Sequence, residues 1–269
     1  MSRFVVFGNP ISHSLSPQLQ TLFAQQFGLV IDYQKHYVPL DQFRETVDVF
    51  RANAGVGANI TIPFKTQAFD YADQHTERAT RVRAVNTFIF KNTICIGDNT
   101  DGVGLIRDLK NNLNAPIENQ TILILGAGGA TRGILGEIIR EKPHKILIHN
   151  RTLENAKQLA LNFNSHFEID IYSDETNIDL VINATNLDFQ HEFDLNFDLS
   201  QTICYDLNYG QRHQTFLTWA KKNKARFVAD GLGMLVEQGA ESFYQWIGKR
   251  PDTKGVIELF RNRARSAAE

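Results

Sequence analysis

The chain has 269 residues, 42% of them hydrophobic, and can bury the core of one large domain or of two smaller ones. Its formal net charge of −2 and its pI near 6.5 argue against a nucleic-acid or anionic-membrane partner. No apolar run reaches the ~18–20 residues that cross a bilayer, and the first residues lack the long apolar region of a signal peptide.

The first half of the chain alternates predicted strands and helices, although not in a simple doubly wound order. Helices are predicted to begin at Ser16-Pro17 with the serine as N-cap, after Asp41 as N-cap, near Phe64, and at Asp101. The predicted strands are residues 4–7, 36–38 and 57–62, and residues 85–90 and 93–96 are predicted to form a β-hairpin.

The second half begins, after a loop at residues 114–116, with the apolar run Thr121–Leu125, which is typical of a strand buried on both faces. This run leads into the sequence Gly126-Ala127-Gly128-Gly129-Ala130, then an amphipathic helix, and then a second apolar strand, Lys145–His149. Strand, glycine turn, helix and strand form the first half of a dinucleotide-binding unit, in which the glycine backbone and the helix N-terminus hold a pyrophosphate.

The residues after the second strand indicate which dinucleotide binds. Enzymes that bind an unphosphorylated ribose usually have Asp or Glu there, whereas this chain has Asn150, Arg151 and Thr152. An acid would repel a 2′-phosphate, while Arg151 can pair with it and stack on the adenine, so NADP is favoured. The alternative is a surface turn with a helix N-cap at Thr152.

The βα alternation then continues with a helix at Leu153–Phe163, strands at 180–184, 202–206 and 226–229, and a helix at 215–222. Two helices, 234–246 and 253–265, end the chain, and we expect them to pack on the first domain. The predicted fold is therefore α/β with two domains and a cleft between them. Residues 1–102, with the returning residues 236–269, form an α/β substrate domain, and residues 103–235 form a Rossmann-like NADP domain.

The cysteines and histidines indicate whether disulfides or a metal site are expected. Cys95 and Cys204 both lie in apolar runs, which predicts buried free thiols and favours a cytoplasmic protein. The eight histidines and two cysteines have neither HxxxH nor CxxC spacing, so no metal site is expected.

Four segments of the first half carry more polar residues than strand ends need: residues 11–17, 57–65, 84–87 and 97–102. Within the second segment, Lys65 is predicted in the first turn of a helix, where the helix dipole disfavours a cation, and this hints at function.

Each segment also has a plainer interpretation. Ser14 and Ser16 can be turn and cap residues, Asn86 can stabilise the hairpin by hydrogen bonds, and Asp101 can be an N-cap.

Taken together, the polar segments and the glycine-rich unit resemble the shikimate 5-dehydrogenase family. The matching stretches run from Gly8 to Phe243 and are GNPISHSLSP, GANITIPFK, AVNT, GDNTDGVG, GAGGATRG, NRT, INAT and DGLGMLVEQGAESF. The resemblance implies an oxidoreductase that reversibly reduces 3-dehydroshikimate to shikimate with NADP, in the pathway to chorismate and the aromatic amino acids.

The resemblance also implies the roles of individual residues. Ser14 and Ser16 match the family's grip on the substrate carboxylate, Thr61 and Tyr209 assist it, and Gln238 adds an amide. Asn59, Asn86 and Asp101 match contacts to the ring hydroxyls, and Lys65 and Asp101 match the catalytic pair. The implied cofactor-binding residues are Gly126, Gly128, Gly129, Ala130, Asn150, Arg151, Thr152, Ala184, Thr185, Leu207, Gly231 and Met234.

The residue types fit this chemistry independently of the resemblance. Hydride transfer to a ketone leaves an alkoxide, which needs a proton and a nearby cation, and a lysine ammonium supplies both. A carboxylate beside the lysine holds it in place and accepts a hydrogen bond from a hydroxyl.

Four positions depart from the family pattern. Gln20 replaces a common histidine, Arg83 replaces a usual glycine, residues 186–188 replace a small glycine-containing loop, and Asn155 stands where a second arginine often joins the phosphate clamp.

Two other functions remain open from the sequence. One is a quinate/shikimate dehydrogenase that uses both NAD and NADP, and the other is a non-catalytic, nucleotide-sensing protein with the same fold. Both a monomer and a homodimer fit the sequence.

Overall fold

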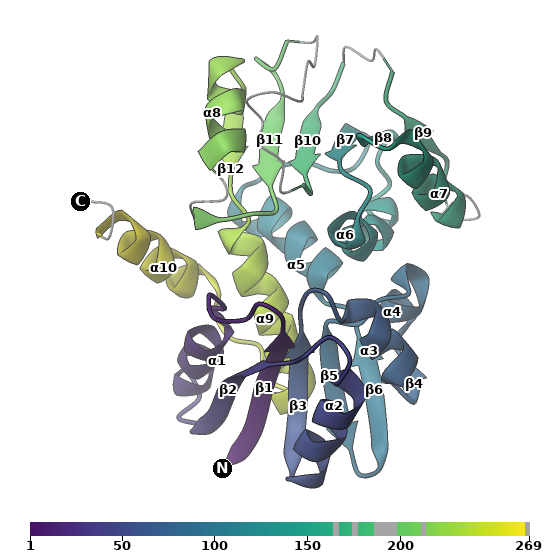
Figure 1. Ribbon diagram of the computed structural model, residues 1–269. Helices are drawn as coiled ribbons and strands as arrows, with labels where there is room; N and C mark the ends of the chain where they lie inside the picture. Colours follow the sequence, from purple (N-terminus) through teal and green to yellow (C-terminus); the bar gives the residue numbers. More distant parts are fainter. Residues whose placement is uncertain (164–166, 174–176, 186–197, 211–213, 267–269) are drawn as a thin grey trace. The chain divides into compact units, whose positions relative to one another are not determined.

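A computed structural model describes residues 1–163, 167–173, 177–185, 198–210 and 214–266 (Figure 1). The chain divides into two compact units. The first unit contains residues 1–104 and 236–269, and the second contains residues 105–235. The loop at residues 186–188, where the sequence departs from the family pattern, lies outside the described residues.

The first unit contains a six-stranded mixed sheet in the order β2-β1-β3-β5-β6-β4. Strand β1 is parallel to β2 and β3, while β5 is antiparallel to both of its neighbours, β3 and β6. The strands are β1 Ser2–Gly8, β2 Ile31–Tyr37, β3 Gly55–Ile60, β4 Gln74–His75, β5 Thr87–Lys91 and β6 Ile94–Asp98. The predicted hairpin is confirmed as β5 and β6, and its turn residue Asn92 has φ 55°.

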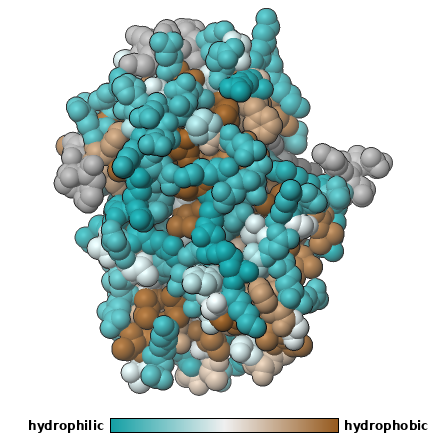
Figure 2. All heavy atoms as spheres, turned by 180° about the vertical axis from the view of Figure 1, so that it is seen from behind, coloured by the Kyte–Doolittle hydropathy of each residue, from teal (hydrophilic) through white to brown (hydrophobic). Residues whose placement is uncertain are grey.

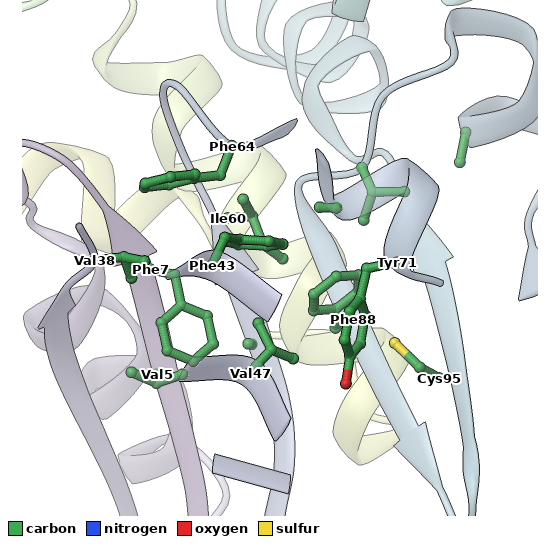
Figure 3. Packing of buried hydrophobic residues seen from close by; sticks show 14 residues of the cluster. Val5, Phe7, Val38, Phe43, Val47, Ile60, Phe64, Tyr71, Phe88 and Cys95 are labelled. Carbon is green, nitrogen blue, oxygen red and sulfur yellow. The ribbon is translucent and has the colours of Figure 1, made fainter. Parts of the chain in front are cut away.

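Apolar residues on both faces of β1 explain its continuous hydrophobic sequence. Val5 and Phe7 belong to a buried cluster with residues of α2 and α3, among them Phe43 and Tyr71 (Figure 3). Phe4 and Val6 belong to a second cluster on the opposite face, against which Trp246 of α9 packs. The helices with residues in this unit are α1 Ser16–Gln25, α2 Phe43–Ala52, α3 Lys65–Tyr71, α4 Glu77–Val82, α5 Asp101–Arg107, α9 Leu232–Ile247 and α10 Lys254–Ser266.

The second unit contains a six-stranded, fully parallel sheet in the order β12-β11-β10-β7-β8-β9. This is the strand order of doubly wound dinucleotide-binding folds, with the topological switch point between β7 and β10. The strands are β7 Thr121–Leu125, β8 Lys145–His149, β9 Ile169–Ile171, β10 Leu180–Asn183, β11 Ile203–Asp206 and β12 Phe227–Ala229. The α-helices that lie wholly within the described part of this unit are α6 Gly129–Arg140, α7 Leu153–Phe163 and α8 Gln214–Lys222. The predicted two-domain α/β fold is therefore confirmed.

Two predicted helix caps are wrong. Helix α2 begins at Phe43 with Gln42 as its N-cap, because a turn from Pro39 to Gln42, with a 3.1 Å backbone bond, includes Asp41. Helix α1 begins at Ser16, so this serine lies inside the helix rather than at its cap. The short elements β4, α4 and β9, and the π-helical turn Asp108–Asn112, were not predicted.

The surface is largely polar, and both thiols of the chain are buried. Hydrophilic side chains cover much of the face shown in Figure 2. Exposed large hydrophobic residues such as Val30, Leu40 and Leu161 come from separate parts of the sequence. Cys95 and Cys204 are buried free thiols, and burial raises the pKa of each to about 12. Among the described residues, no helix is long and apolar enough to cross a membrane, and no cluster of His, Cys, Asp or Glu could hold a metal ion.

Candidate active site

An ion pair between Lys65 and Asp101 lies in the first unit. The Lys65 Nζ atom is 2.6 Å from Oδ2 of Asp101, and the side chains are 23% and 9% exposed. The other carboxylate oxygen, Oδ1, accepts a 2.8 Å hydrogen bond from the Asn86 amide. Because both carboxylate oxygens are bonded, the position of the lysine ammonium is well defined, while part of its side chain stays accessible to a ligand.

The turn before α3 fixes where Lys65 begins its helix. The Thr61 N–H donates to the carbonyl of Phe7 at the end of β1, and the Phe64 N–H donates to the carbonyl of Thr61. Phe64 is fully buried, and its ring stacks on that of Phe43 with centroids 5.1 Å apart. The buried phenylalanine therefore anchors the residue immediately before the lysine in the hydrophobic core.

A network of buried amide and hydroxyl groups surrounds Asn86. Its Oδ1 atom accepts from the Thr100 N–H and the Thr87 hydroxyl, both at 2.9 Å. Its Nδ2 atom donates to Asp101 and to the Thr100 hydroxyl, and lies 3.4 Å from Oε1 of Gln238 on α9. Asn86, Asp101 and Gln238, all assigned to the substrate by the resemblance, are thus brought together.

Asn59 uses both ends of its side chain within the protein. Its Oδ1 atom accepts a 2.7 Å bond from the Tyr33 hydroxyl. Its Nδ2 atom faces the Ser242 hydroxyl at 3.0 Å, the Thr87 hydroxyl at 3.2 Å and the carbonyl of Asn86 at 3.3 Å. Only 6% of Asn59 is exposed, so its side chain organises the surrounding polar groups.

Sequence reasoning did not select three of these partners: Tyr33, Thr87 and Ser242. Ser242 lies four residues after Gln238, on the same face of α9, and this spacing is the signal that could have identified it.

The two serines of the first polar segment lie at the N-terminal end of α1. The Ser14 hydroxyl is 3.1 Å from that of Ser16 and also accepts from the Ser16 N–H at 3.3 Å. Ser14 therefore acts as the turn residue that the plainer interpretation describes. Both hydroxyl groups also lie where the first N–H groups of a helix lack partners within the helix, which suits an anion.

Two of the departures from the family pattern have clear structural settings. The Gln20 amide donates to the carbonyl of Gly239 at 3.0 Å, but its buried Oε1 atom has no hydrogen-bond partner among the described residues. Arg83 ends α4 in the left-handed conformation, with φ 50°, and its guanidinium lies over the ring of Phe69. A usual glycine at this position is explained by its tolerance of positive φ.

The glycine-rich loop of the second unit follows β7. Gly126 has φ +105°, and a Cβ atom there would lie 2.8 Å from Cγ2 of Thr185, so only glycine fits. No atom lies within 4 Å of an added Cβ at Gly128 or Gly129, and these two residues and Ala130 are exposed at the start of α6. The backbone here is accessible to a pyrophosphate, as NADP requires.

Asn150 braces this loop against the next one. Its Oδ1 atom accepts from the Ala127 N–H at 3.1 Å, and its Nδ2 atom donates to the Thr152 carbonyl at 2.8 Å. Arg151 and Thr152 are exposed between β8 and α7. The amide of Asn150 thus connects the glycine-rich loop, the candidate pyrophosphate site, to the loop that carries Arg151, the candidate 2′-phosphate residue.

The other predicted cofactor residues follow the carboxyl ends of neighbouring strands. Ala184 and Thr185 follow β10, where the Thr185 N–H and hydroxyl both donate to Oδ1 of Asn183, at 3.0 and 2.7 Å. Leu207 follows β11, and an added Cβ at Gly231 would lie 2.2 Å from its carbonyl oxygen. Met234 is in the first turn of α9, and Tyr209 follows Leu207 within the same unit. These residues fit a dinucleotide at the switch point of the sheet.

Comparisons with protein families cover most of the chain. Residues 6–88 match the shikimate dehydrogenase substrate binding domain, and residues 108–188 match the model described as shikimate / quinate 5-dehydrogenase. Residues 231–259 match the shikimate 5′-dehydrogenase C-terminal domain.

Individual relatives match over nearly their full length. The shikimate dehydrogenase (NADP(+)) of Vesicomyosocius okutanii is 45% identical, with 97% of this chain and 100% of the relative covered. The crystal structure of an Ael1 enzyme from Pseudomonas putida is 39% identical, with a TM-score of 0.88 and coverage of 96% and 98% of the two chains. A shikimate 5-dehydrogenase from Thermus thermophilus, solved with NADP(H) and shikimate, is 31% identical, with a TM-score of 0.87 and coverage of 98% and 100%.

Proposed function

The chain belongs to the shikimate dehydrogenase family, and we propose that it catalyses the reversible, NADP-dependent reduction of 3-dehydroshikimate to shikimate. The observation that carries the proposal is the 2.6 Å pair between Lys65 and Asp101, since it provides a proton donor and a cation for a developing alkoxide. Its placement beside Asn86 and Gln238 supplies hydrogen-bonding groups for a polyol.

On the substrate side, each residue type has a defined task. The hydroxyls of Ser14 and Ser16 donate to the carboxylate at the N-terminus of α1, with Thr61 assisting. Asn86 and Asp101 bond the ring hydroxyls, and Gln238 adds its amide. The side chains of both Asn59 and Asn86 are also bonded within the protein, and Asn59 in addition holds Asn86, Thr87 and Ser242 in place.

The proton moves through Lys65. When the ketone is reduced, its Nζ atom donates a proton to the carbonyl oxygen, and in the reverse direction it takes the proton from the alcohol. Asp101 holds the ammonium in place in both directions. The nicotinamide ring, when bound, supplies or accepts the hydride.

NADP is held by the second unit in this proposal. The backbone of Gly126, Gly128, Gly129 and Ala130 binds the pyrophosphate at the start of α6, and Arg151 pairs with the 2′-phosphate. Asn150 positions both loops, and Thr152 completes the clamp. Ala184, Thr185, Leu207, Gly231 and Met234 form the wall around the nicotinamide.

A matrix of initial rates tests the proposal. Shikimate and quinate are each oxidised with NADP and with NAD, and the rates are compared as kcat/KM. The proposal predicts that shikimate with NADP is the best combination. The second candidate, a quinate/shikimate dehydrogenase with dual cofactor use, is supported by the matched family model and by Asn155 in the clamp. Comparable rates with quinate and with NAD would favour it, and no turnover in any combination would favour a non-catalytic protein.

A further inference from the structure

Arg78 of α4 joins three parts of the first unit that lie far apart in the sequence. Its Nε atom donates to Oδ1 of Asp98 at 2.6 Å, and its Nη2 atom donates to Oδ2 of the same carboxylate at 2.5 Å. The Nη2 atom also donates to Oε1 of Glu241 on α9 at 2.9 Å. The Asp98 side chain is completely buried and that of Glu241 is 6% exposed, so both carboxylates are shielded from water, while the Arg78 side chain is 19% exposed.

From Asp98 a continuous series of hydrogen bonds leads to the catalytic pair. Oδ1 of Asp98 accepts from the Asn99 N–H at 2.8 Å. Oδ1 of Asn99 in turn accepts from the Asp101 N–H at 3.1 Å, and the Asp101 carboxylate holds Lys65. The Asp98 carbonyl also accepts from the Asn86 N–H at 3.0 Å. The buried carboxylate therefore fixes the backbone on which Asp101 is placed.

The contact of Arg78 with Glu241 leads to the part of α9 that carries Gln238. Glu241 accepts from Arg78, from Arg250 and from the Gln245 amide, so its carboxylate is bonded on both oxygens. Gln238 lies three residues before Glu241, and its Oε1 atom is 3.4 Å from both Asn86 Nδ2 and Thr100 Oγ1. Holding Glu241 therefore also holds the turn of α9 that carries Gln238.

We propose that Arg78 is a positioning residue for the reaction, which holds the Asp98–Asp101 segment and the Gln238 turn of α9 in the geometry that Lys65 requires. This inference rests on the proposed function, because it assumes that Lys65 and Asp101 carry the proton transfer. Neither the sequence motifs nor the comparisons with relatives single out Arg78 for this task.

The guanidinium group is suited to this task because it is planar and donates through several N–H groups in fixed directions. It forms two parallel bonds to one carboxylate and reaches a second with the same nitrogen. Burial alone would lower the pKa of Arg78, but its bonds and proximity to Asp98, and then to Glu241, raise the pKa above the ordinary value. Arg78 therefore stays charged; it compensates the buried carboxylate of Asp98 and shares that of Glu241 with Arg250.

Arg78→Lys keeps the charge but removes the planar fork, so it separates positioning from charge compensation. We expect kcat with shikimate to fall by roughly 10- to 100-fold, since a displacement of about 1 Å can cost that much, while KM for NADP changes less than about two-fold. The ratio of kcat in H2O to kcat in D2O should rise, because a misplaced Lys65 makes proton transfer slower. A residue that only stabilises the fold would lower the melting temperature and leave that ratio and kcat per folded molecule unchanged.

Asp98→Asn is the second variant, since it keeps the side-chain shape and an acceptor for the Asn99 N–H while breaking one bond of the fork. It should show the same rise in the solvent isotope effect. The matched control is Asp73→Asn, because Asp73 accepts from the Cys95 N–H near the opposite end of β6 and should affect stability only.

Wild-type kinetics in both Arg78→Lys and Asp98→Asn would overturn the proposal. Lys65→Ala is measured alongside to test the proposed function separately. Unchanged activity in Lys65→Ala would show that Lys65 does not transfer the proton, which is the assumption on which the role of Arg78 rests.

Discussion

Lys65 and Asp101 are the first residues of two helices, α3 and α5, and their charged groups meet at 2.6 Å. An acid at a helix N-terminus is favoured by the helix dipole, whereas a cation there is disfavoured. Asp101 thus occupies a favourable position and compensates Lys65, which occupies an unfavourable one. The fold does not require a cation at this unfavourable position, and the proposed proton transfer explains why Lys65 is there.

The serine pair should be specific for the substrate carboxylate. Ser14→Ala removes one hydrogen bond to a charged group, worth about 1.5–3 kcal/mol, so shikimate should bind roughly 10- to 150-fold more weakly. The affinity for an analogue with a neutral group in place of the carboxylate should fall much less in this variant. Binding of both ligands is measured by titration calorimetry. Equal losses would mean that Ser14, which also accepts from the Ser16 N–H, acts only as a turn residue.

Arg151 should determine the preference for NADP over NAD. One charge-assisted contact is worth about 1.5–3 kcal/mol, which predicts a preference of roughly 10- to 150-fold in the wild-type protein. Arg151→Ala should raise KM for NADP and leave KM for NAD nearly unchanged, and Asn155→Arg should increase the preference. Lys157→Ala, an exposed residue further along α7, is the control and should change it less than about two-fold. If Arg151→Ala weakens the binding of NADP and NAD equally, Arg151 is not the residue that binds the 2′-phosphate.

Gln20 should be replaceable by methionine with a gain in stability. Its buried Oε1 atom lacks a partner among the described residues, at a cost of about 1–3 kcal/mol, while its bond to the Gly239 carbonyl contributes only about 0.5–1.5 kcal/mol. Gln20→Met removes both and should raise the free energy of unfolding by about 1 kcal/mol, measured by urea denaturation.

The control for this prediction is Gln26→Met at the end of the same helix. Both ends of the Gln26 amide are bonded to the Asp252 backbone, so its loss should lower the free energy of unfolding. A loss of stability in Gln20→Met as well would indicate that an ordered water satisfies Oε1.

Glu241 should make stability depend on pH in the acid range. Burial alone would raise its pKa, but the bond from Arg250 and the charge of Arg78 outweigh it and lower the pKa from 4.5 to about 2. A carboxylate with a lowered pKa stabilises the fold above its unfolded value and loses that contribution as the pH falls through the folded value.

The stability difference between wild type and Glu241→Gln should therefore be largest above about pH 5 and shrink towards about pH 2. It is measured as the free energy of unfolding across this range, with Glu77→Gln as a control, because that side chain is 83% exposed. A difference that stays constant with pH would contradict the lowered pKa.

Sequence reasoning was most successful in the second unit. The bounds of β7, β8 and α7 agree with the predicted ranges, because continuous apolar strands between glycine and proline signals have few alternative structures. The short elements of the first unit were missed for a physical reason. Gln74 and His75 are polar and become β4 only by pairing with Ile96 and Gly97 of β6, which no local pattern reveals.

The candidate site divides in the same way. Residues such as Lys65, Asn86 and Gly126 lie in local motifs whose spacing indicates their chemistry. The role of Arg78 depends on Glu241, 163 positions away, and on the bonds from Asp98 to Asp101. It can therefore be inferred only from the folded structure and not from a local motif. Likewise, the sequence does not reveal that the Asn59 side chain is hydrogen-bonded to Tyr33 and Ser242.

The most direct test of the account is the kcat of Lys65→Ala for shikimate oxidation with NADP. If the Lys65 ammonium transfers the proton, kcat should fall by roughly 10²–10⁴-fold while shikimate binding changes little. Lys91→Ala, an exposed residue at the end of β5, should behave as wild type and controls for the loss of a positive charge in the same unit. A Lys65→Ala variant that retains about half of the wild-type kcat would contradict the account.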